Sequence, residues 1–255
     1  MQDLTALMQY QAAPQLLAGR NILVTGAGDG IGRTAALTFA QHGATVILLG
    51  RTEAKLETVY DEIEAAGGPQ PVIVTLDLDS ANRQDYLNLN NEIIESLGAL
   101  HGLLHNAGIL GEMKPLAQYE EDTFKRVLNT NVTSHFLLTQ ALLPSLTNAN
   151  DASIVFSSSS VGHKGRAYWG AYAISKFAIE GMMQTWAEEL ADTSAIRVNS
   201  LNPGATRTRM RQQAYPGENP ENNPLPADIM GAYLFLMGAD SLSINGMALD
   251  AQPRK

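Results

Sequence analysis

The chain has 255 residues, of which 45% are hydrophobic and 17% charged, a composition typical of a globular domain that can bury a substantial core. Its formal net charge of -9 argues against a nucleic-acid or anionic-membrane partner, because binding phosphate groups requires a basic face. The chain has no cysteine, which excludes disulfides and cysteine metal sites and fits a reducing cytoplasm.

Residues 1–19 carry neither a basic start nor a signal-type apolar core, so we expect an extension on the surface of one domain formed by residues 20–255. No apolar run in the chain approaches the ~20 residues that a membrane span needs. The sequence shows no internal repeat and no interdomain linker, and no metal site is expected.

Apolar residues follow two alternating patterns along the domain. Short β-branched runs predict strands at 21–25, 44–49, 71–76, 100–105, 152–157, 196–201 and about 246–250. Longer segments with helical spacing predict helices at 31–42, 53–66, 81–97, 120–146, 172–191 and 226–238. Strands that are apolar almost throughout and separated by helices predict an α/β doubly wound Rossmann-type fold, with one parallel sheet covered on both faces.

The first predicted strand runs into the glycine-rich stretch "TGAGDGIG", residues 25–32. A helix is expected directly after it, so several backbone N–H groups and a helix N-terminus would form an anion site. Glycines let the backbone approach a pyrophosphate closely and adopt positive φ. The stretch does not fit the common G-x-G-x-x-G fingerprint, and a tight strand–helix turn without a ligand is the competing interpretation.

The end of the second predicted strand indicates which nucleotide the glycine turn would hold. NAD sites usually place an acidic side chain there, about 20 residues after the glycines, to bind the ribose 2′-hydroxyl. Here Gly50 occupies that place and Arg51 follows, and a guanidinium suits a 2′-phosphate. We therefore expect NADP(H) in preference to NAD(H), with Arg33 able to assist. NAD(H) is kept as the second option because Asp29 adds a negative charge and Glu53 could face the ribose.

The third predicted strand ends near Asp77, in "VTLDLDS". A carboxylate at the carboxyl end of a strand can accept a hydrogen bond from an adenine amino group. The same side chain would serve equally well as a helix cap, and the sequence leaves both interpretations open.

Two side chains of "AYAISK", Tyr172 and Lys176, lie four residues apart at the start of a predicted helix and share one face. An ammonium beside a phenol stabilises the phenolate, which would lower the pKa of Tyr172 and make it a usable general acid or base. Alone, this spacing also occurs by chance on many helices. Ser159, thirteen residues before Tyr172, lies in a serine run at the edge where such sheets bind ligands, and its hydroxyl could hold a substrate oxygen.

Several stretches together resemble the motif series of the short-chain dehydrogenase/reductase family. They are "TGAGDGIG", "NAG" at 106–108, "LNTNVTSHF" with Asn131, the serine run with Ser159, "YAISK", and "NPGATRT" at 202–208. The motifs follow the order and spacing of that family, and the resemblance runs from about residue 18 to 250. The sequence is similar to a bacterial subgroup of oxidoreductases with unassigned substrates.

The resemblance implies a catalytic tetrad and a cofactor site. Tyr172 would be the general acid/base, and Ser159 would hold the substrate oxygen. Lys176 would lower the pKa of Tyr172 and bind the nicotinamide ribose, while Asn131 would position a water that links Lys176 to solvent. The implied cofactor-binding residues are Gly26, Asp29, Gly30, Ile31, Gly32, Arg51, Asp77, Leu78, Asn106, Ala107, Gly108, Tyr172, Lys176, Pro203, Gly204, Thr206 and Thr208.

Two features depart from the family pattern. His105 stands before "NAG" where the family commonly has asparagine, and we interpret it as a packed, neutral residue. The chain ends in "GMALDAQPRK" in place of a Val-Asp-Gly-Gly-like turn, which puts in doubt the contact of this end with neighbouring subunits or substrate.

Residues 209–226 lie where the family keeps a substrate loop, and their Pro, Asn and Gly content predicts a mobile lid. Arg209 and Arg211 could bind an anionic substrate, although two solvated arginines are the simpler interpretation.

Five other side chains cannot be assigned from the sequence. Met210, Tyr215 and Met230 could line a substrate site, but core packing or exposure explains them equally well. Trp169 and His163 border the catalytic segment without a role that spacing alone would give.

The predicted helices at 120–146 and 172–191 carry apolar residues on more than one face. The family packs these two helices against a partner subunit. The resemblance therefore implies a homodimer or homotetramer.

We therefore expect an NADP(H)-dependent oxidoreductase that interconverts a small-molecule carbonyl and an alcohol. The alternative is a non-catalytic NADP(H)-binding protein that uses the same fold for sensing or interaction. The intact tetrad favours the enzyme, since binding alone needs neither Tyr172 nor Lys176. An epimerase or dehydratase is disfavoured because such extended relatives carry a larger C-terminal region.

Overall fold

The computed structural model describes residues 4–253 and contains a seven-stranded parallel sheet. Its strands are β1 (Asn21–Thr25), β2 (Thr45–Gly50), β3 (Val72–Thr75), β4 (Gly102–His105), β5 (Ala152–Ser157), β6 (Ile196–Asn202) and β7 (Ala248–Asp250). They lie in the order β3-β2-β1-β4-β5-β6-β7. The direction of winding reverses between β1 and β4, and the crevice at the carboxyl ends of these strands is where doubly wound folds bind ligands.

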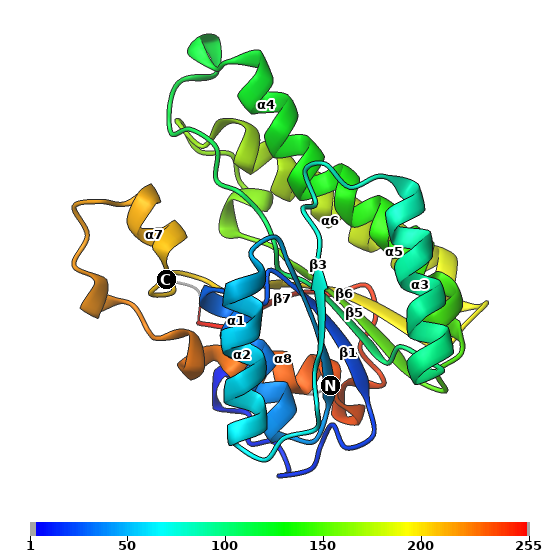
Figure 1. Ribbon diagram of the computed structural model, residues 1–255. Coiled ribbons are helices and arrows are strands. Elements are labelled where there is room, and N and C mark those ends of the chain that lie inside the picture. Colours follow the sequence, from blue (N-terminus) through cyan, green and yellow to red (C-terminus); the bar gives the residue numbers. More distant parts are fainter. Residues whose placement is uncertain (1–3, 254–255) are drawn as a thin grey trace.

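Helices cover both faces of the sheet, as the apolar strands predict (Figure 1). One face carries α1 (Gly30–Gln41), α2 (Glu53–Ala65) and α8 (Met230–Met237), and the other carries α3 (Arg83–Leu97), α5 (Ser134–Thr147) and α6 (Gly170–Ala191). Each layer has its own cluster of buried side chains, with Phe39 and Tyr233 in the first and Tyr86 and Phe156 in the second. The predicted doubly wound α/β fold is confirmed, with element boundaries shifted by a few residues.

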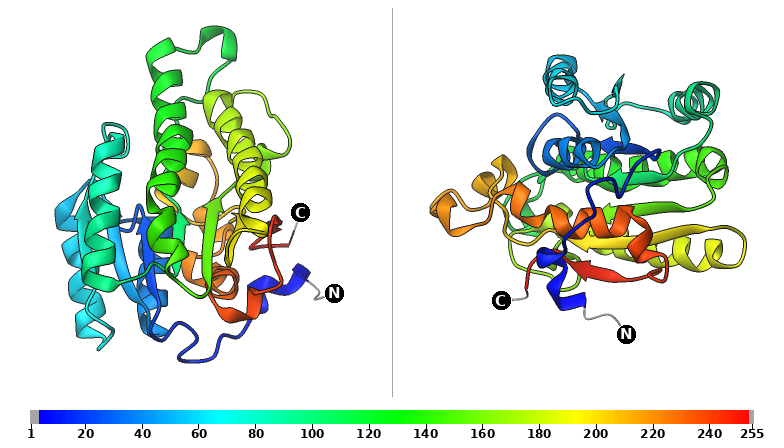
Figure 2. Two further views of the ribbon diagram at one scale, coloured as in Figure 1. Left: turned by 90° about the vertical axis from the view of Figure 1, so that its right-hand side faces the viewer. Right: turned by 90° about the horizontal axis from the view of Figure 1, so that it is seen from below.

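The predicted helix at 120–146 is continuous but not uniform. It consists of α4 (Glu121–Leu128), a π-helical turn (Asn129–Thr133) and α5, which Figure 2 shows as one rod beside α6. A π-helical turn widens the backbone by one residue per turn and is frequent at functional sites. Here it lies at Asn131, and apolar spacing alone gave no sign of it.

The segment 209–226, predicted to be a mobile lid, is partly helical at its start, and its mobility stays a prediction. The helix α7 (Arg209–Ala214) begins there because the Thr208 side chain accepts a hydrogen bond from the Arg211 amide at 3.1 Å. Short 3₁₀ turns follow at Pro220–Asn222 and Pro226–Ile229. This cap signal was present in the sequence, but α7 is too short to show an apolar period.

The N-terminal segment is packed onto α8. It forms a 3₁₀ turn at Leu4–Gln9, and Leu7 and Leu17 are buried in the same cluster as α1 and α8. A Cβ on Gly231 would stand 2.9 Å from the Leu7 carbonyl oxygen, which shows how closely the segment approaches the helix. Residues 1–3 of the predicted extension lie outside the described residues, and its division from the domain stays a prediction. No helix between residues 4 and 253 has the length and apolarity needed to cross a membrane.

A partly buried ion cluster closes the end of the sheet opposite the crevice. Asp151 accepts a hydrogen bond from Arg20 Nη1 at 2.7 Å and a second from Arg197, whose side chain is buried. Burial raises the pKa of Asp151, but the hydrogen bonds from Arg20 and Arg197 outweigh it and hold this pKa below its usual value.

We predict that Asp151→Asn lowers the free energy of unfolding by about 3 kcal/mol, because Arg197 is left buried without its counter-charge. The folded-state pKa of Asp151 is depressed, so its stabilisation is present at neutral pH and is lost as the pH falls through that value. Urea unfolding at a series of acidic pH values should show that the free energies of unfolding of Asp151→Asn and wild type approach each other as the pH falls. Glu121→Gln, which removes an exposed pair with Lys125, should change stability by less than about 0.5 kcal/mol. Equal losses in both variants would contradict the account.

Candidate active site

Tyr172 and Lys176 lie on the first turns of α6, against the carboxyl end of β5. Both side chains are buried, with 8% and 3% of their surfaces exposed. Lys176 Nζ donates a hydrogen bond to the Ser157 carbonyl oxygen at 2.7 Å and lies 5.4 Å from the centroid of the Tyr172 ring. The four-residue spacing therefore brings the phenol and the ammonium together as predicted.

The pKa of Tyr172 moves in the direction opposite to the predicted one. Burial raises the pKa of Tyr172 to about 12, and a hydrogen bond with Ser159 only partly offsets this rise. Burial also lowers the pKa of Lys176 to about 8, although the charge of Glu180 acts in the other direction. The prediction of a lowered Tyr172 pKa was wrong for this structure because the depth of burial, which spacing does not reveal, dominates.

The run of four serines at 157–160 begins with the last residue of β5, and the structure separates the three that follow it. Ser159 pairs with Tyr172 and accepts a hydrogen bond from the Val161 amide as the cap of a short 3₁₀ turn. Ser158 points into the protein and donates to Glu180, a buried carboxylate that also accepts from Ser200 at 2.9 Å. Ser160 is exposed. Among these residues Ser159 is therefore the one that faces Tyr172, which spacing alone did not establish.

Asn131 lies buried in the π-helical turn and ties α6 to the loop after β4. Its Oδ1 accepts from the Ile109 amide at 2.8 Å, and its Nδ2 donates to the Ile109 carbonyl and to Ser175 Oγ, both at 3.0 Å. Ser175 precedes Lys176, so Asn131 fixes the helix segment that carries the lysine.

Beneath the site, the ring of His105 is stacked on Phe156 and packs at a tilt against His135. The ring centroids of His105 and His135 are 4.6 Å apart, and His105 Nε2 lies 2.8 Å from Thr139 Oγ1. Burial, with the neighbouring His135, holds the pKa of His105 well below its usual range. Burial and then the charge of Lys176 lower the pKa of His135 to about 3. His105 is thus packed and neutral, as predicted, while the role of His135 in this packing was not foreseen.

The glycine turn forms an open backbone surface at the start of α1. Gly26 and Gly30 have positive φ, at 70° and 54°, which side-chain-bearing residues rarely adopt. A Cβ on Gly32 would lie 2.3 Å from the Gly26 carbonyl oxygen, so α1 can begin this close to β1 only with glycine there. Ile31, the remaining predicted residue of the turn, is partly buried against the α1–α8 cluster.

The end of β4 is bonded to the end of β1. Thr25 Oγ1 accepts from the Asn106 and Ala107 amides at 3.0 Å, and Asn106 Nδ2 donates to the Thr25 carbonyl at 3.1 Å. A Cβ on Gly108 would be 3.3 Å from Asn131 Oδ1. The "NAG" stretch therefore connects the glycine turn with the residues around Lys176.

Charged side chains near the glycine turn are arranged differently from what the sequence indicated. Lys55 of α2 binds Asp29 at 2.7 Å, and this hydrogen bond lowers the pKa of Asp29 despite partial burial. Arg33, expected to assist in phosphate binding, is instead bonded to Glu62 with Nη2–Oε1 at 2.6 Å. Arg51 is exposed at the end of β2. Lys55 was missed because its contact with Asp29 depends on how α2 packs, although it lies one turn after Arg51.

Of the two sequence interpretations of Asp77, the helix cap is wrong, and the contact with an adenine amino group stays a prediction. Asp77 Oδ1 accepts from the Asp79 amide at 3.1 Å within a turn, and the cap of α3 is Asn82, which accepts from the Gln84 amide. Asp77 is exposed at the end of the crevice. The side chain of Leu78 is buried in the α3–α5 cluster, which leaves its backbone to make any contact with a ligand.

The loop after β6 is held by the C-terminal end of the chain. Gln252 Nε2 donates to the carbonyl oxygens of Pro203 and Ala205, at 2.7 and 3.0 Å, and lies 3.1 Å from Thr206 Oγ1. Gly204 has a φ of 71°, and a Cβ there would meet Gln252 Nε2 at 2.9 Å. The atypical C-terminal residues thus support this loop from within the same chain, a contact that the sequence gave no means to predict.

A pocket of about 260 Å³ lies between the glycine turn and α7, lined by Asp29, Gly30, Arg207, Thr208 and Arg209 among others. Thr208 Cγ2 would be 3.6 Å from a Cβ on Gly30, so the turn after β1 and the loop after β6 face each other across it. The pocket lies at the N-terminal end of α1, which favours an anion, and both cationic and acidic side chains line it.

Comparisons with known proteins agree with this geometry. The family model described as short chain dehydrogenase matches residues 20–219. The uncharacterized oxidoreductase YciK of Escherichia coli strain K12 is 51% identical over 96% of this chain and 97% of its own. A short-chain dehydrogenase structure from Pseudomonas syringae is 57% identical with a TM-score of 0.92, and the two chains are covered to 95% and 99%. One from Escherichia coli CFT073, solved with NADPH, is 51% identical with a TM-score of 0.92 over 95% of this chain and all of that one.

We predict that Lys176→Met raises the free energy of unfolding at neutral pH by about 1–2 kcal/mol, because it removes a buried charge of lowered pKa. The pKa of Lys176 falls from 10.5 to about 8 on folding, so its contribution to stability is complete above pH 10.5 and is lost as the pH falls through 8. The extra stability of Lys176→Met over wild type should therefore shrink as the pH rises from about 8 to 10.5.

Chemical denaturation of both proteins at several pH values measures this difference. Lys125→Met on exposed α4 is the control and should change stability by less than about 0.5 kcal/mol. A Lys176→Met protein that is less stable than wild type throughout the window would contradict the prediction.

Proposed function

The chain belongs to the short-chain dehydrogenase family, and we propose that it is an NADP(H)-dependent oxidoreductase that reduces a small-molecule carbonyl to an alcohol, or runs the reverse reaction. The observation that carries this proposal is the group of Tyr172, Ser159 and Lys176 at the carboxyl end of β5, in which Tyr172 and Lys176 are buried. A protein that only binds a nucleotide has no need to bury an ammonium beside a phenol.

The substrate oxygen would lie between the hydroxyls of Tyr172 and Ser159, each of which can donate a hydrogen bond to it. With a pKa of about 12, Tyr172 is protonated at neutral pH, which is the state that a proton donor to the forming alkoxide requires. The bound cofactor supplies the hydride to the carbonyl carbon. Ser159 stabilises the charge that develops on the substrate oxygen.

Lys176 would restore the proton that Tyr172 gives up. Its pKa of about 8 lies near neutral pH, so the ammonium can release a proton at little cost. Asn131 holds the helix segment around Lys176 through Ser175 and Ile109, and we propose that it positions the water through which Lys176 is reprotonated.

The cofactor would lie across the carboxyl ends of β1 and β4. The glycine turn fits a pyrophosphate because Gly26 and Gly30 adopt positive φ and Gly32 lets α1 begin close to β1, which places a helix N-terminus beside the turn. The remaining implied contacts are proposed at the ends of β2, β3, β4 and β6: Arg51, Asp77, the Leu78 backbone, Asn106, Ala107, Gly108, Pro203, Gly204, Thr206 and Thr208.

NADP(H) is proposed in preference to NAD(H). Lys55 neutralises Asp29, the residue that argued against a phosphorylated ribose, while Arg51 is exposed at the end of β2. Two dehydrogenase structures that resemble this chain at 51% identity are complexes with NADP and NADPH.

We further propose that the protein forms a homo-oligomer through α5 and α6. Phe136 on α5 and Ile174 and Phe177 on α6 are large apolar side chains with 39%, 39% and 47% of their surfaces exposed. Apolar side chains of this size on neighbouring helices favour burial against a partner subunit.

Tyr172→Phe should lower kcat at least about a hundredfold, because the proton donor is removed, and should leave the dissociation constant of NADPH within about twofold. Oxidation of NADPH against a panel of ketones and aldehydes measures the first, and fluorescence titration the second. Tyr60→Phe, on the outer side of α2, should retain full activity. If the wild type binds NADPH but turns over no carbonyl or alcohol, the chain is a cofactor-binding sensor instead.

Arg51→Ala should weaken NADPH binding by about tenfold and NADH binding by less than about twofold, since only NADPH carries the 2′-phosphate. Arg33→Ala is the matched control, because Arg33 is already bonded to Glu62. This variant should change the dissociation constants of NADPH and NADH by less than about twofold. Tighter binding of NADH than of NADPH by the wild type would overturn the cofactor assignment.

A further inference from the structure

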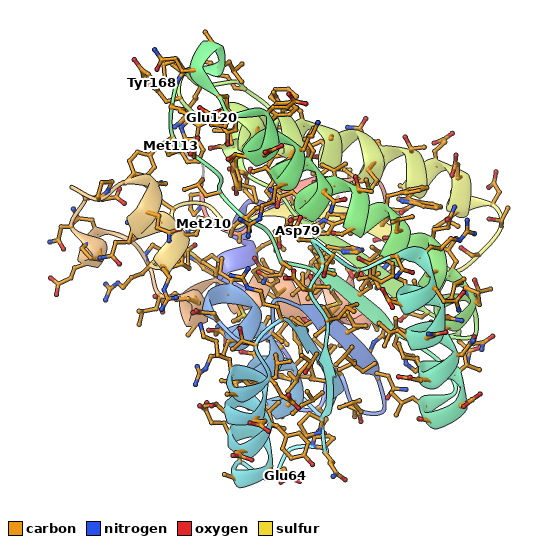
Figure 3. The ribbon with its side chains drawn as sticks, turned by 45° about the horizontal axis from the view of Figure 1, so that its top comes forward. Glu64, Asp79, Met113, Glu120, Tyr168 and Met210 are labelled. Carbon is orange, nitrogen blue, oxygen red and sulfur yellow. The ribbon has the colours of Figure 1, made fainter. Side chains whose placement is uncertain are left out.

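One side of Tyr172 is bounded by apolar side chains from four separate segments. We call this set the apolar wall. It consists of Leu110 and Met113 after β4, Val161 after β5, Trp169 at the start of α6, and Met210 and Ala214 of α7. Leu110 and Val161 are buried, whereas the others are partly exposed. Figure 3 shows Met113 and Met210 on neighbouring segments at the same end of the molecule.

Trp169 connects the proton donor with the lid. Its ring centroid lies 5.7 Å from that of Tyr172 and 5.9 Å from that of Tyr215, which follows α7. A flat group bound against the indole would therefore touch the catalytic phenol on one side and the lid on the other. Indole rings supply large, rigid apolar contact area at such positions.

The residues on both sides of Trp169 adopt positive φ. Tyr168 has a φ of 73°, and within residues 4–253 it is the only non-glycine residue with positive φ. Gly170 has a φ of 40°, and a Cβ there would lie 2.5 Å from the Tyr119 ring. Strain of this kind persists where the surrounding structure holds it, and it clusters at ligand-binding sites.

Three cations near the apolar wall lie close to acidic side chains. Arg211 makes two hydrogen bonds of 2.6 Å to Glu218 and stacks 3.8 Å from the Tyr215 ring centroid. Lys114 binds Glu112 at 2.6 Å. Arg209 lies 4.0 Å from Asp29. An anionic substrate would have to displace Glu218 from Arg211, which argues against Arg211 as the group that binds such a substrate.

We propose that the substrate is an uncharged carbonyl compound whose carbonyl carries a ring-sized apolar group, bound against Trp169. Met113 and Met210 adapt to the outline of this group, because methionine side chains are flexible and polarisable. Tyr215 covers it from the lid. This inference rests on the proposed oxidoreductase function and names the substrate class of the same site.

Three ketones test the proposal with NADPH as reductant: acetophenone, its 4-carboxylate and butanone. We expect kcat/KM for acetophenone to exceed that for either of the others by about tenfold or more. Trp169→Ala should lower the acetophenone value by about tenfold and the butanone value by less than about threefold. Trp169→Phe, which keeps an aromatic ring, should retain most of the kcat/KM for acetophenone that Trp169→Ala loses. Preference for the carboxylate, or equal losses on all three ketones, would overturn the proposal.

A binding measurement separates this proposal from the proposed function. The chain has two tryptophans, so Trp169 is the only indole in a Trp186→Phe protein. Acetophenone added to its complex with NADP should quench the Trp169 fluorescence, and the 4-carboxylate should do so only at about tenfold higher concentration or more. Quenching without turnover of any ketone would support binding of the ring against Trp169 and refute the oxidoreductase function. Turnover of ketones without stronger quenching by acetophenone than by its 4-carboxylate would refute the proposed binding against Trp169 and leave the oxidoreductase function standing.

Discussion

The burial of the Lys176 ammonium is the constraint on which the candidate site depends. The ammonium donates its hydrogen bond to the Ser157 carbonyl rather than to a carboxylate, and Glu180, one turn further along α6, bonds to Ser158 and Ser200 instead. A charge held in this way is costly, which is why its pKa falls toward 8. The same contact fixes α6 against the end of β5 and thereby sets where Tyr172 meets Ser159.

The crevice divides into two halves of different character that share Tyr172. The glycine turn, the "NAG" stretch and the loop held by Gln252 form a polar half built mostly from backbone groups. The apolar wall forms the other half, and α7 borders both through the pocket at Arg209 and the contact between Tyr215 and Trp169. The segment that contains α7 therefore lies at the border between the two halves.

The fold and the catalytic spacing could be predicted because they follow from local patterns. Apolar runs separated by helical segments are enough to predict a covered parallel sheet, and four-residue spacing places Tyr172 beside Lys176. The proposed cofactor contacts remain predictions. What failed depended on three-dimensional packing: the direction of the Tyr172 pKa follows from burial, and the partner of Asp29 is Lys55 on another helix. The positive φ of Tyr168, next to Trp169, has no signature in residue type.

The most direct test of this account is an NMR titration of Lys176 in the protein without bound cofactor, with the side-chain resonances assigned from the spectrum of Lys176→Met. The buried position predicts a pKa of about 8, well below the ordinary value of 10.5. A Lys176 side chain that titrates near 10.5 would show that the ammonium is solvated or paired with an acid. The proposed return of the proton to Tyr172 would then lose its physical basis.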